Sequence, residues 1–108
     1  PRPRNADPQA MIILALPARL THAEAGPCAT ALVAQVLQFA GQGNTGPGAT
    51  VAADASALQH FDSSALAVLL ECGRAAQRAG ARLVVRGLPE RLRALAALYG
   101  VAELLPEA

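Results

Sequence analysis

The chain has 108 residues, of which 53% are hydrophobic and 16% are charged, and its formal net charge is +1 at neutral pH. This length predicts one domain, and the hydrophobic content argues against an intrinsically disordered chain. A charge near zero, with 3% aromatic residues and no tryptophan, argues against nucleic-acid binding, which needs a basic surface. The apolar runs are far shorter than the ~20 residues that a membrane span needs.

The first half of the chain predicts a strand, a helix and a loop. Residues 1–10 are polar and rich in proline, so we expect a flexible lead-in before one domain over residues 11–108. Residues 11–16 form a short apolar run typical of a buried strand. Apolar residues at helical spacing follow over residues 24–40, with a proline in the first turn, where its missing N–H costs little. Four glycines and a proline in residues 41–48 predict a surface loop without a phosphate-binding pattern.

The alternation of strand and helix continues in the second half. Residues 50–55 predict a weak strand, residues 63–79 the best helix of the chain, and residues 83–85 a compact strand. Either Asp62 or Ser63 is suited to cap the N-terminus of this helix, and the glycine after it is suited to end it.

A last helix begins at Pro89 and ends before Gly100, and the apolar tail 101–105 is expected to dock on the domain. The residues expected to form the buried stripe of this helix are Leu92, Leu95, Leu98 and Tyr99. The order of elements predicts an α/β fold in which helices pack on a mostly parallel central sheet.

Acidic and hydroxyl side chains stand at two junctions of the predicted elements. Asp54 and Ser56 follow the second strand, and Asp62, Ser63 and Ser64 precede the best helix. Such groups commonly satisfy the unpaired N–H groups of a helix start, and this capping role is the simplest interpretation. The alternative is that one hydroxyl faces outward, where it is modified or contacts a partner.

The helical period divides residues 63–79 into a core face and an outer face. The core face is predicted to contain Leu66, Leu69, Leu70, Gly73 and Ala76. Ser64, Val68, Glu71 and Ala75 then form the outer face, although Val68 and Ala75 are unusual on a freely solvated surface. Alanine-rich composition, a partner-binding face and a face for self-association all remain open as interpretations of this stripe.

These motifs resemble the STAS-domain family, the fold of anti-sigma-factor antagonists. The resemblance extends from about residue 11 to residue 105 and rests on Asp54-x-Ser56, on Asp62-Ser63-Ser64 with the following ALAVLL, and on the ending LAALYGVAELLP. The ending is most similar to one branch of the family, the small cytoplasmic STAS subunit of the Mla phospholipid-trafficking system. That subunit binds the ATPase of an ABC transporter at the inner membrane.

The resemblance to this branch implies a regulatory subunit without catalytic activity or cofactor. It implies a cytoplasmic protein that is peripheral to the inner membrane through its partner and has no span of its own. We expect the helix over residues 63–79 to dock on the ATPase, with contacts at Ser63, Ser64, Ala67, Val68 and Glu71.

The resemblance also implies an alternative, an anti-sigma-factor antagonist controlled by a kinase. In those proteins the second hydroxyl of the motif, which matches Ser64, is phosphorylated. In the Mla branch the first hydroxyl matters, and it matches Ser63. Both serines therefore remain possible phosphorylation sites. Antagonists usually carry glycine after the second serine, whereas this chain has Ala65, which together with the ending favours the transporter branch.

The sequence gives little support to catalysis or metal binding. His60, Asp62 and the two serines could suggest a hydrolytic triad, but close neighbours in sequence rarely point at one another, and no GxSxG elbow is present. His22, His60, Cys28 and Cys72 lack the spacing of metal ligands, and two isolated thiols fit a reduced chain better than a disulfide. We therefore expect no catalytic residue and no metal site.

Overall fold

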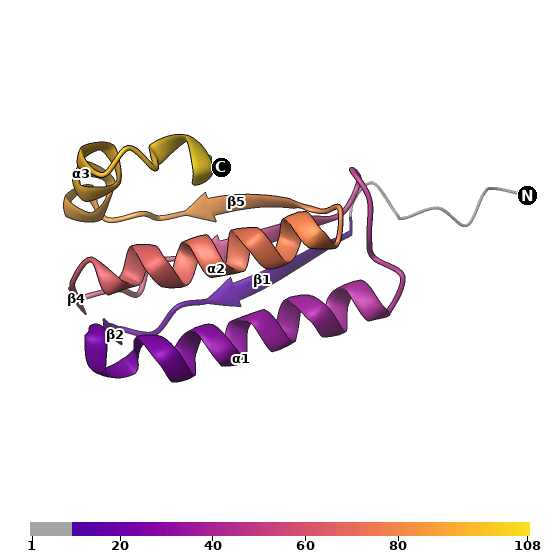
Figure 1. The fold of residues 1–108 in the computed structure, drawn as a ribbon, viewed down its shortest axis with the longest axis horizontal. Helices are drawn as coiled ribbons and strands as arrows, with labels where there is room; N and C mark the ends of the chain where they lie inside the picture. Colours follow the sequence, from indigo (N-terminus) through magenta and orange to yellow (C-terminus); the bar gives the residue numbers. More distant parts are fainter. Residues whose placement is uncertain (1–9) are drawn as a thin grey trace, which may run out of the picture.

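Three parallel strands form the central sheet of the fold (Figure 1). The structure is a computed structural model that describes residues 10–108. Strand β3 (Thr50–Asp54) lies between β1 (Met11–Ala15) and β5 (Arg82–Arg86) and pairs with both in parallel. The predicted α/β architecture with a mostly parallel sheet is confirmed.

The register of the strands places one apolar row across the sheet. Leu14 stands beside Ala53, and Ala53 stands beside Val85. All three side chains are fully buried, because alternate strand residues point to the face that the helices cover. The small side chain of Ala53 in the middle strand leaves room for the helices above it.

Two helices lie side by side over one face of the sheet (Figure 1). Helix α1 spans His22–Gly41 and helix α2 spans Ser64–Arg78, while the shorter α3 (Glu90–Leu98) lies beyond the end of β5. As predicted, Gly80 follows the end of α2 and closes it, because its N–H donates to the carbonyl of Gln77 at 2.9 Å. None of the described helices is both long enough and apolar enough to cross a bilayer.

Helix α1 begins two residues earlier than predicted, because a capping box forms at its start. The Thr21 hydroxyl accepts a hydrogen bond from the N–H of Ala23, and the Glu24 carboxylate accepts one from the N–H of Thr21 at 2.8 Å. The Thr21 hydroxyl and N–H lower the pKa of Glu24. This Thr-x-x-Glu spacing was available in the sequence and identifies the true start of the helix.

Two short strands were not predicted. Strand β2 (Arg19–Leu20) pairs in parallel with β4 (His60–Phe61), and each follows the end of a longer strand. Segments of two residues are too short to show a period, so hydrophobic patterning does not reveal them. Their pairing brings the start of α1 next to the start of α2.

The predicted buried stripe of α3 is wrong in part. Leu92 is fully buried and Leu95 is half-buried, but Leu98 and Tyr99 are 76% and 57% exposed. The residue that joins Leu92 in the core is Ala96, which is 1% exposed. In an alanine-rich helix, the hydrophobic pattern assigns the large side chains to the buried face. This helix instead packs through Leu92 and the alanine one turn after it, Ala96.

The C-terminal tail docks on the sheet as expected, and it does so partly through its backbone. Leu105 is buried, while Leu104 in the short 3-10 helix η1 (Ala102–Leu104) is exposed. The N–H of Val85 donates to the carbonyl of Pro106 at 2.8 Å, and the N–H of Ala108 donates to the carbonyl of Val85 at 2.9 Å. The tail therefore covers part of the free edge of β5.

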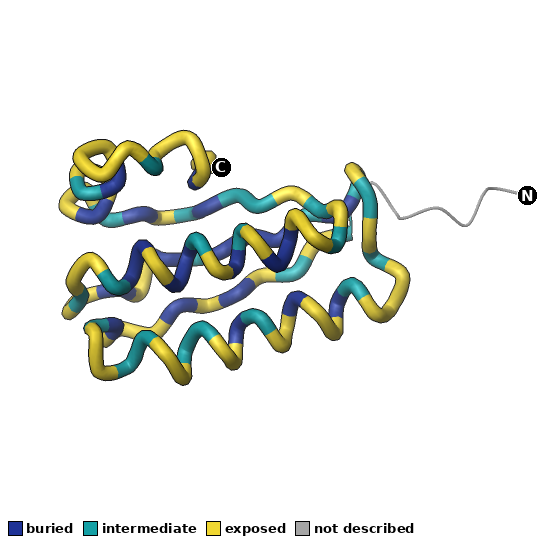
Figure 2. Tube along the Cα trace, in the orientation of Figure 1, coloured by how far each residue is buried: buried dark blue, intermediate teal, exposed yellow. Residues whose placement is uncertain are grey.

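The predicted outer face of α2 is also wrong in part. Val68 and Ala75 are each only 1% exposed, and Figure 2 shows buried positions recurring along α2. They are buried because α2 packs against both the sheet and α1, so its apolar arc is wider than a single stripe. The unusual apolar character of these positions reflects packing within the domain.

Candidate functional site

The candidate site lies at the start of α2, where one carboxylate joins two helices. Asp62 Oδ1 accepts a hydrogen bond from the N–H of Ser64 at 2.8 Å, and Oδ2 accepts one from the N–H of His22 at 3.1 Å. These two N–H donors lower the pKa of Asp62, so the carboxylate stays charged near neutral pH. Of the two predicted caps, Asp62 is the one that binds the helix start.

The two serines differ in their surroundings. Ser63 precedes the first residue of α2, is exposed, and makes no capping hydrogen bond with its side chain. Ser64 is half-buried, and the next residue, Ala65, is fully buried. The hydroxyl of Ser63 is therefore the one presented to solvent, on a backbone that Asp62 holds in place.

Asp54 and Ser56 form a separate tight turn after β3. Asp54 Oδ1 accepts hydrogen bonds from the hydroxyl of Ser56 at 2.6 Å and from its N–H at 3.0 Å. The hydroxyl, followed by the N–H, lowers the pKa of Asp54. Asp54 thus stabilises its own loop, and this loop lies against Gly87, which follows β5.

The residues predicted to contact a partner divide into two groups. Ser63, Ala67 and Glu71 are exposed along α2, and Glu71 forms an ion pair with Arg74 at 3.0 Å. Val68 lies beneath α1 and is not accessible to a partner while the domain is folded. Ser64 stands at the boundary between the two groups. The binding roles of the accessible residues remain predictions.

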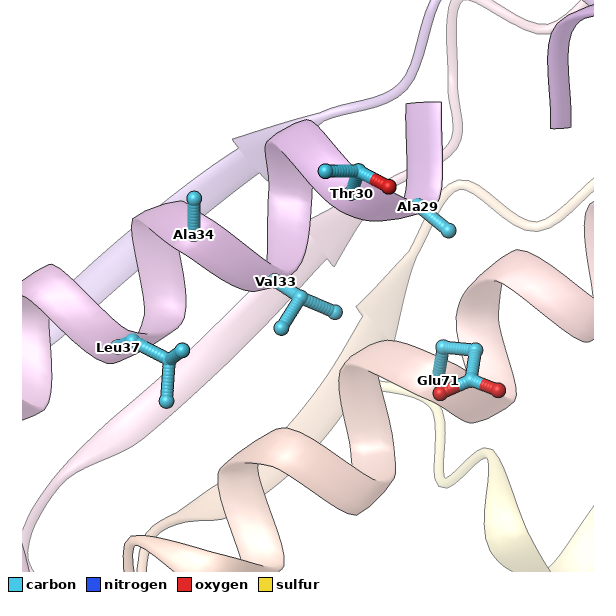
Figure 3. A pocket seen from close by; sticks show the side chains of 6 residues that line it. All are labelled: Ala29, Thr30, Val33, Ala34, Leu37 and Glu71. Carbon is cyan, nitrogen blue, oxygen red and sulfur yellow. The ribbon is translucent and has the colours of Figure 1, made fainter. Parts of the chain in front are cut away.

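A groove between α1 and α2 was not predicted. It has a volume of about 490 Å³, and Figure 3 shows α1 side chains along one wall with Glu71 of α2 opposite. The residues that line it are Ala29, Thr30, Val33, Ala34, Leu37 and Glu71. One signal in the sequence could have revealed this groove. Residues 25–53 contain no charged side chain, although more than half of them belong to a helix on the surface.

Comparison with known proteins identifies the family. A family model described as "Mlab, STAS domain" matches residues 8–106. This chain belongs to the STAS-domain family. A solved anti-sigma-factor antagonist (STAS) domain protein from Planctomyces limnophilus has the same fold, with a TM-score of 0.70. The two are 15% identical, and the match covers 95% of this chain and 85% of that one. No curated protein sequence matches this chain.

The STAS domain is a regulatory, protein-interaction fold, and family membership confirms the resemblance found in the sequence. In this STAS domain, the motif that carries the resemblance lies at the start of α2, where Ser63 is exposed. The 15% identity of the solved structure shows the fold alone.

The cysteines and Asp62 of the STAS domain have structural surroundings and show no sign of a reactive or metal-binding role. Burial raises the pKa of Cys72 to about 12 and also raises that of Cys28, so both thiols stay protonated and are poor nucleophiles and ligands. Among residues 10–108, no cluster of three or more His, Cys, Asp or Glu side chains is placed to hold a metal ion. The Asp62 carboxylate is occupied by backbone N–H groups.

Replacing Asp62 with alanine is expected to lower the melting temperature by roughly 4–8 °C at pH 7, because the helix start loses its cap. The folded pKa of Asp62 is lowered, so its contribution is present above the unfolded pKa and disappears as pH falls through the folded pKa. The melting temperatures of the wild-type chain and of Asp62→Ala should therefore become equal at low pH. Thermal unfolding of the two proteins between pH 7 and pH 2 measures this.

The matched control is Ser63→Ala, which removes an exposed hydroxyl that makes no capping bond and leaves the melting temperature unchanged. A melting temperature that is equally low for Ser63→Ala and Asp62→Ala would contradict the assignment of the cap to Asp62.

Proposed function

We propose that this STAS domain is a non-catalytic regulatory subunit that binds the ATPase of a phospholipid-trafficking ABC transporter. The observation that carries the proposal is the match of the model described as "Mlab, STAS domain" to residues 8–106. The ending LAALYGVAELLP and the alanine at position 65 support the same branch of the family. In this proposal the protein lies at the cytoplasmic side of the inner membrane through its partner, and ATP, Mg²⁺ and lipid belong to the other subunits.

The surface proposed to contact the ATPase is the exposed side of the first turns of α2, formed by Ser63, Ala67 and Glu71. Three features of this surface support the proposal. The Ser63 hydroxyl makes no capping bond and is free to bond a partner, and the small Ala67 allows close approach of another backbone. The Asp62 carboxylate ties the starts of α1 and α2 together, so the surface is rigid before binding.

An alternative function is that of an anti-sigma-factor antagonist controlled by phosphorylation. It is favoured by the exposed hydroxyl of Ser63 at a helix N-terminus, where the helix dipole stabilises a phosphate. It is disfavoured by the ionised Asp62 beside both serines, because a phosphate adds about −1.5 to −2 charge next to that carboxylate. The motif serine of the antagonists matches Ser64, which is half-buried here.

Affinity purification of the chain from its native host tests the proposal. We expect the wild-type chain to retain the ATPase of an ABC transporter, and Ala67→Arg to reduce this retention at least about tenfold, because a long charged side chain prevents close packing at the centre of the surface. Ala97→Arg on α3 is the matched control, since Ala97 is also an exposed helical alanine, and it should retain the ATPase.

Two results would contradict the proposal. If Ala67→Arg retained the ATPase as well as the wild-type chain does, the proposed surface on α2 would not contact the ATPase. Recovery of a kinase in place of an ATPase, with one added phosphate on Ser63 or Ser64 by mass spectrometry, would establish the antagonist function.

A further inference from the structure

The outward side of α1 is uncharged along most of the helix. After Glu24 no charged residue occurs before Asp54, and the exposed positions of α1 in this stretch are occupied by alanine, glycine, proline, threonine, glutamine and leucine. A helix that faces solvent normally carries charged side chains there. Leu37 is 57% exposed, which is unusual for a large apolar side chain on an otherwise neutral surface.

This uncharged side borders the groove between α1 and α2. Ala29, Val33 and Leu37 are spaced four residues apart, so they form one ridge along α1 (Figure 3). Glu71 stands on α2 across the groove. The two helices start together at the Asp62 link and lie side by side, and a furrow between adjacent helices is a shape that a third helix fills.

The groove is continuous with the surface proposed to bind the ATPase. Glu71 lines the groove and also belongs to that surface, and Ala67 lies one turn before it on the same exposed side of α2. A protein that covers Ser63, Ala67 and Glu71 therefore reaches the edge of the groove without crossing any other element.

The charge of the groove indicates the kind of occupant. Among residues 10–108, Glu71 is the only ionisable side chain that lines it, and its ion pair with Arg74 is half-exposed and therefore weak. An anionic lipid surface would need cationic side chains in the groove, and none of those in the described part of the chain lines it. A second copy of the chain would bring another α1 face, which carries neither arginine nor lysine to meet Glu71 and has its one histidine, His22, at the first residue of the helix.

We propose that the groove between α1 and α2 receives an α-helix of the ATPase partner. The apolar side of that helix packs on Val33 and Leu37, and one of its arginine or lysine residues lies beside Glu71. This inference rests on the proposed function, because the ATPase contact at the start of α2 brings the partner to the groove.

Two alanines of α1 provide a matched test by affinity purification of the full chain. Ala34 lines the groove, whereas Ala31 is exposed on α1 and does not line it. We expect Ala34→Glu and Leu37→Glu to reduce retention of the ATPase at least about tenfold, because each places a charged carboxylate where the apolar side of the partner helix packs. Ala31→Glu should retain the ATPase as the wild-type chain does, and circular dichroism should show unchanged melting for all three.

The outcomes separate this inference from the proposed function. If both groove variants retained the ATPase as the wild-type chain does, while Ala67→Arg lost it, the inference that a partner helix occupies the groove would be wrong. The proposed function would then still hold. Absence of an ATPase from the wild-type purification would overturn both. Sedimentation of the isolated chain as a dimer that Leu37→Glu dissociates would overturn the inference in favour of a second copy.

Discussion

Val68→Glu is expected to unfold the STAS domain. Val68 is 1% exposed and lies where α2 meets α1, so a glutamate there would place a carboxylate in the core. An unpaired buried charge costs several kcal/mol, which is a large part of the roughly 5–15 kcal/mol that holds a domain of this size together. We expect the cooperative thermal transition, followed by circular dichroism, to be lost or to move down by more than about 15 °C.

The neighbouring exposed residue provides the control for this prediction. Ala67→Glu introduces the same side chain one position earlier, on the solvent side of α2, and should melt as the wild-type protein does. If Val68→Glu also kept the wild-type melting temperature, α1 would not be packed on α2 as the structure shows. Because Val68 is buried, a charge at this position is expected to act on the fold of the domain before it acts on any contact with a partner.

Gly87→Ala has the second largest expected effect. Gly87 has a φ of +64°, and a Cβ atom there would lie 2.7 Å from the Cβ of Ser56 and 3.0 Å from its Cα. The left-handed backbone costs about 1–2 kcal/mol for alanine, and overpacking adds roughly 1–3 kcal/mol because the neighbour is partly backbone. The free energy of unfolding, measured with urea, is expected to fall by about 2–5 kcal/mol.

Gly100→Ala separates the two causes. Gly100 has a φ of +74°, but a Cβ atom there would meet no other atom within 4 Å. Its substitution should therefore cost only about 1–2 kcal/mol, the contribution of the backbone conformation alone. Equal losses in the two variants would show that the loop after β3 does not approach Gly87.

The order of strands and helices was predictable because each long element carries its own local pattern. The apolar run of β1, the period of α2 and the glycines that end α2 and α3 act within a few residues, and the structure confirms them. The start of α1 was also encoded locally, by the Thr21–Glu24 capping box, although the hydrophobic period alone placed it two residues too late.

The candidate site was predictable only in its composition. The sequence showed a carboxylate and two hydroxyls at the start of α2, and it left open which of them caps the helix. Asp62 caps α2 through the nearby N–H of Ser64, but its second hydrogen bond, from the N–H of His22 40 residues away, forms because the pairing of β2 with β4 brings the two helix starts together. No pattern within α2 contains that information.

The amino-acid sequence by itself determined the succession of elements, the turns that end them and the chemical groups at the start of α2, since these depend on neighbours along the chain. Only the tertiary structure decided which apolar residues are covered. A helical period shows that Val68 or Leu98 lies on a given side, but the element that packs against that side decides its burial. Here α1 covers Val68, whereas nothing in residues 10–108 covers most of Leu98.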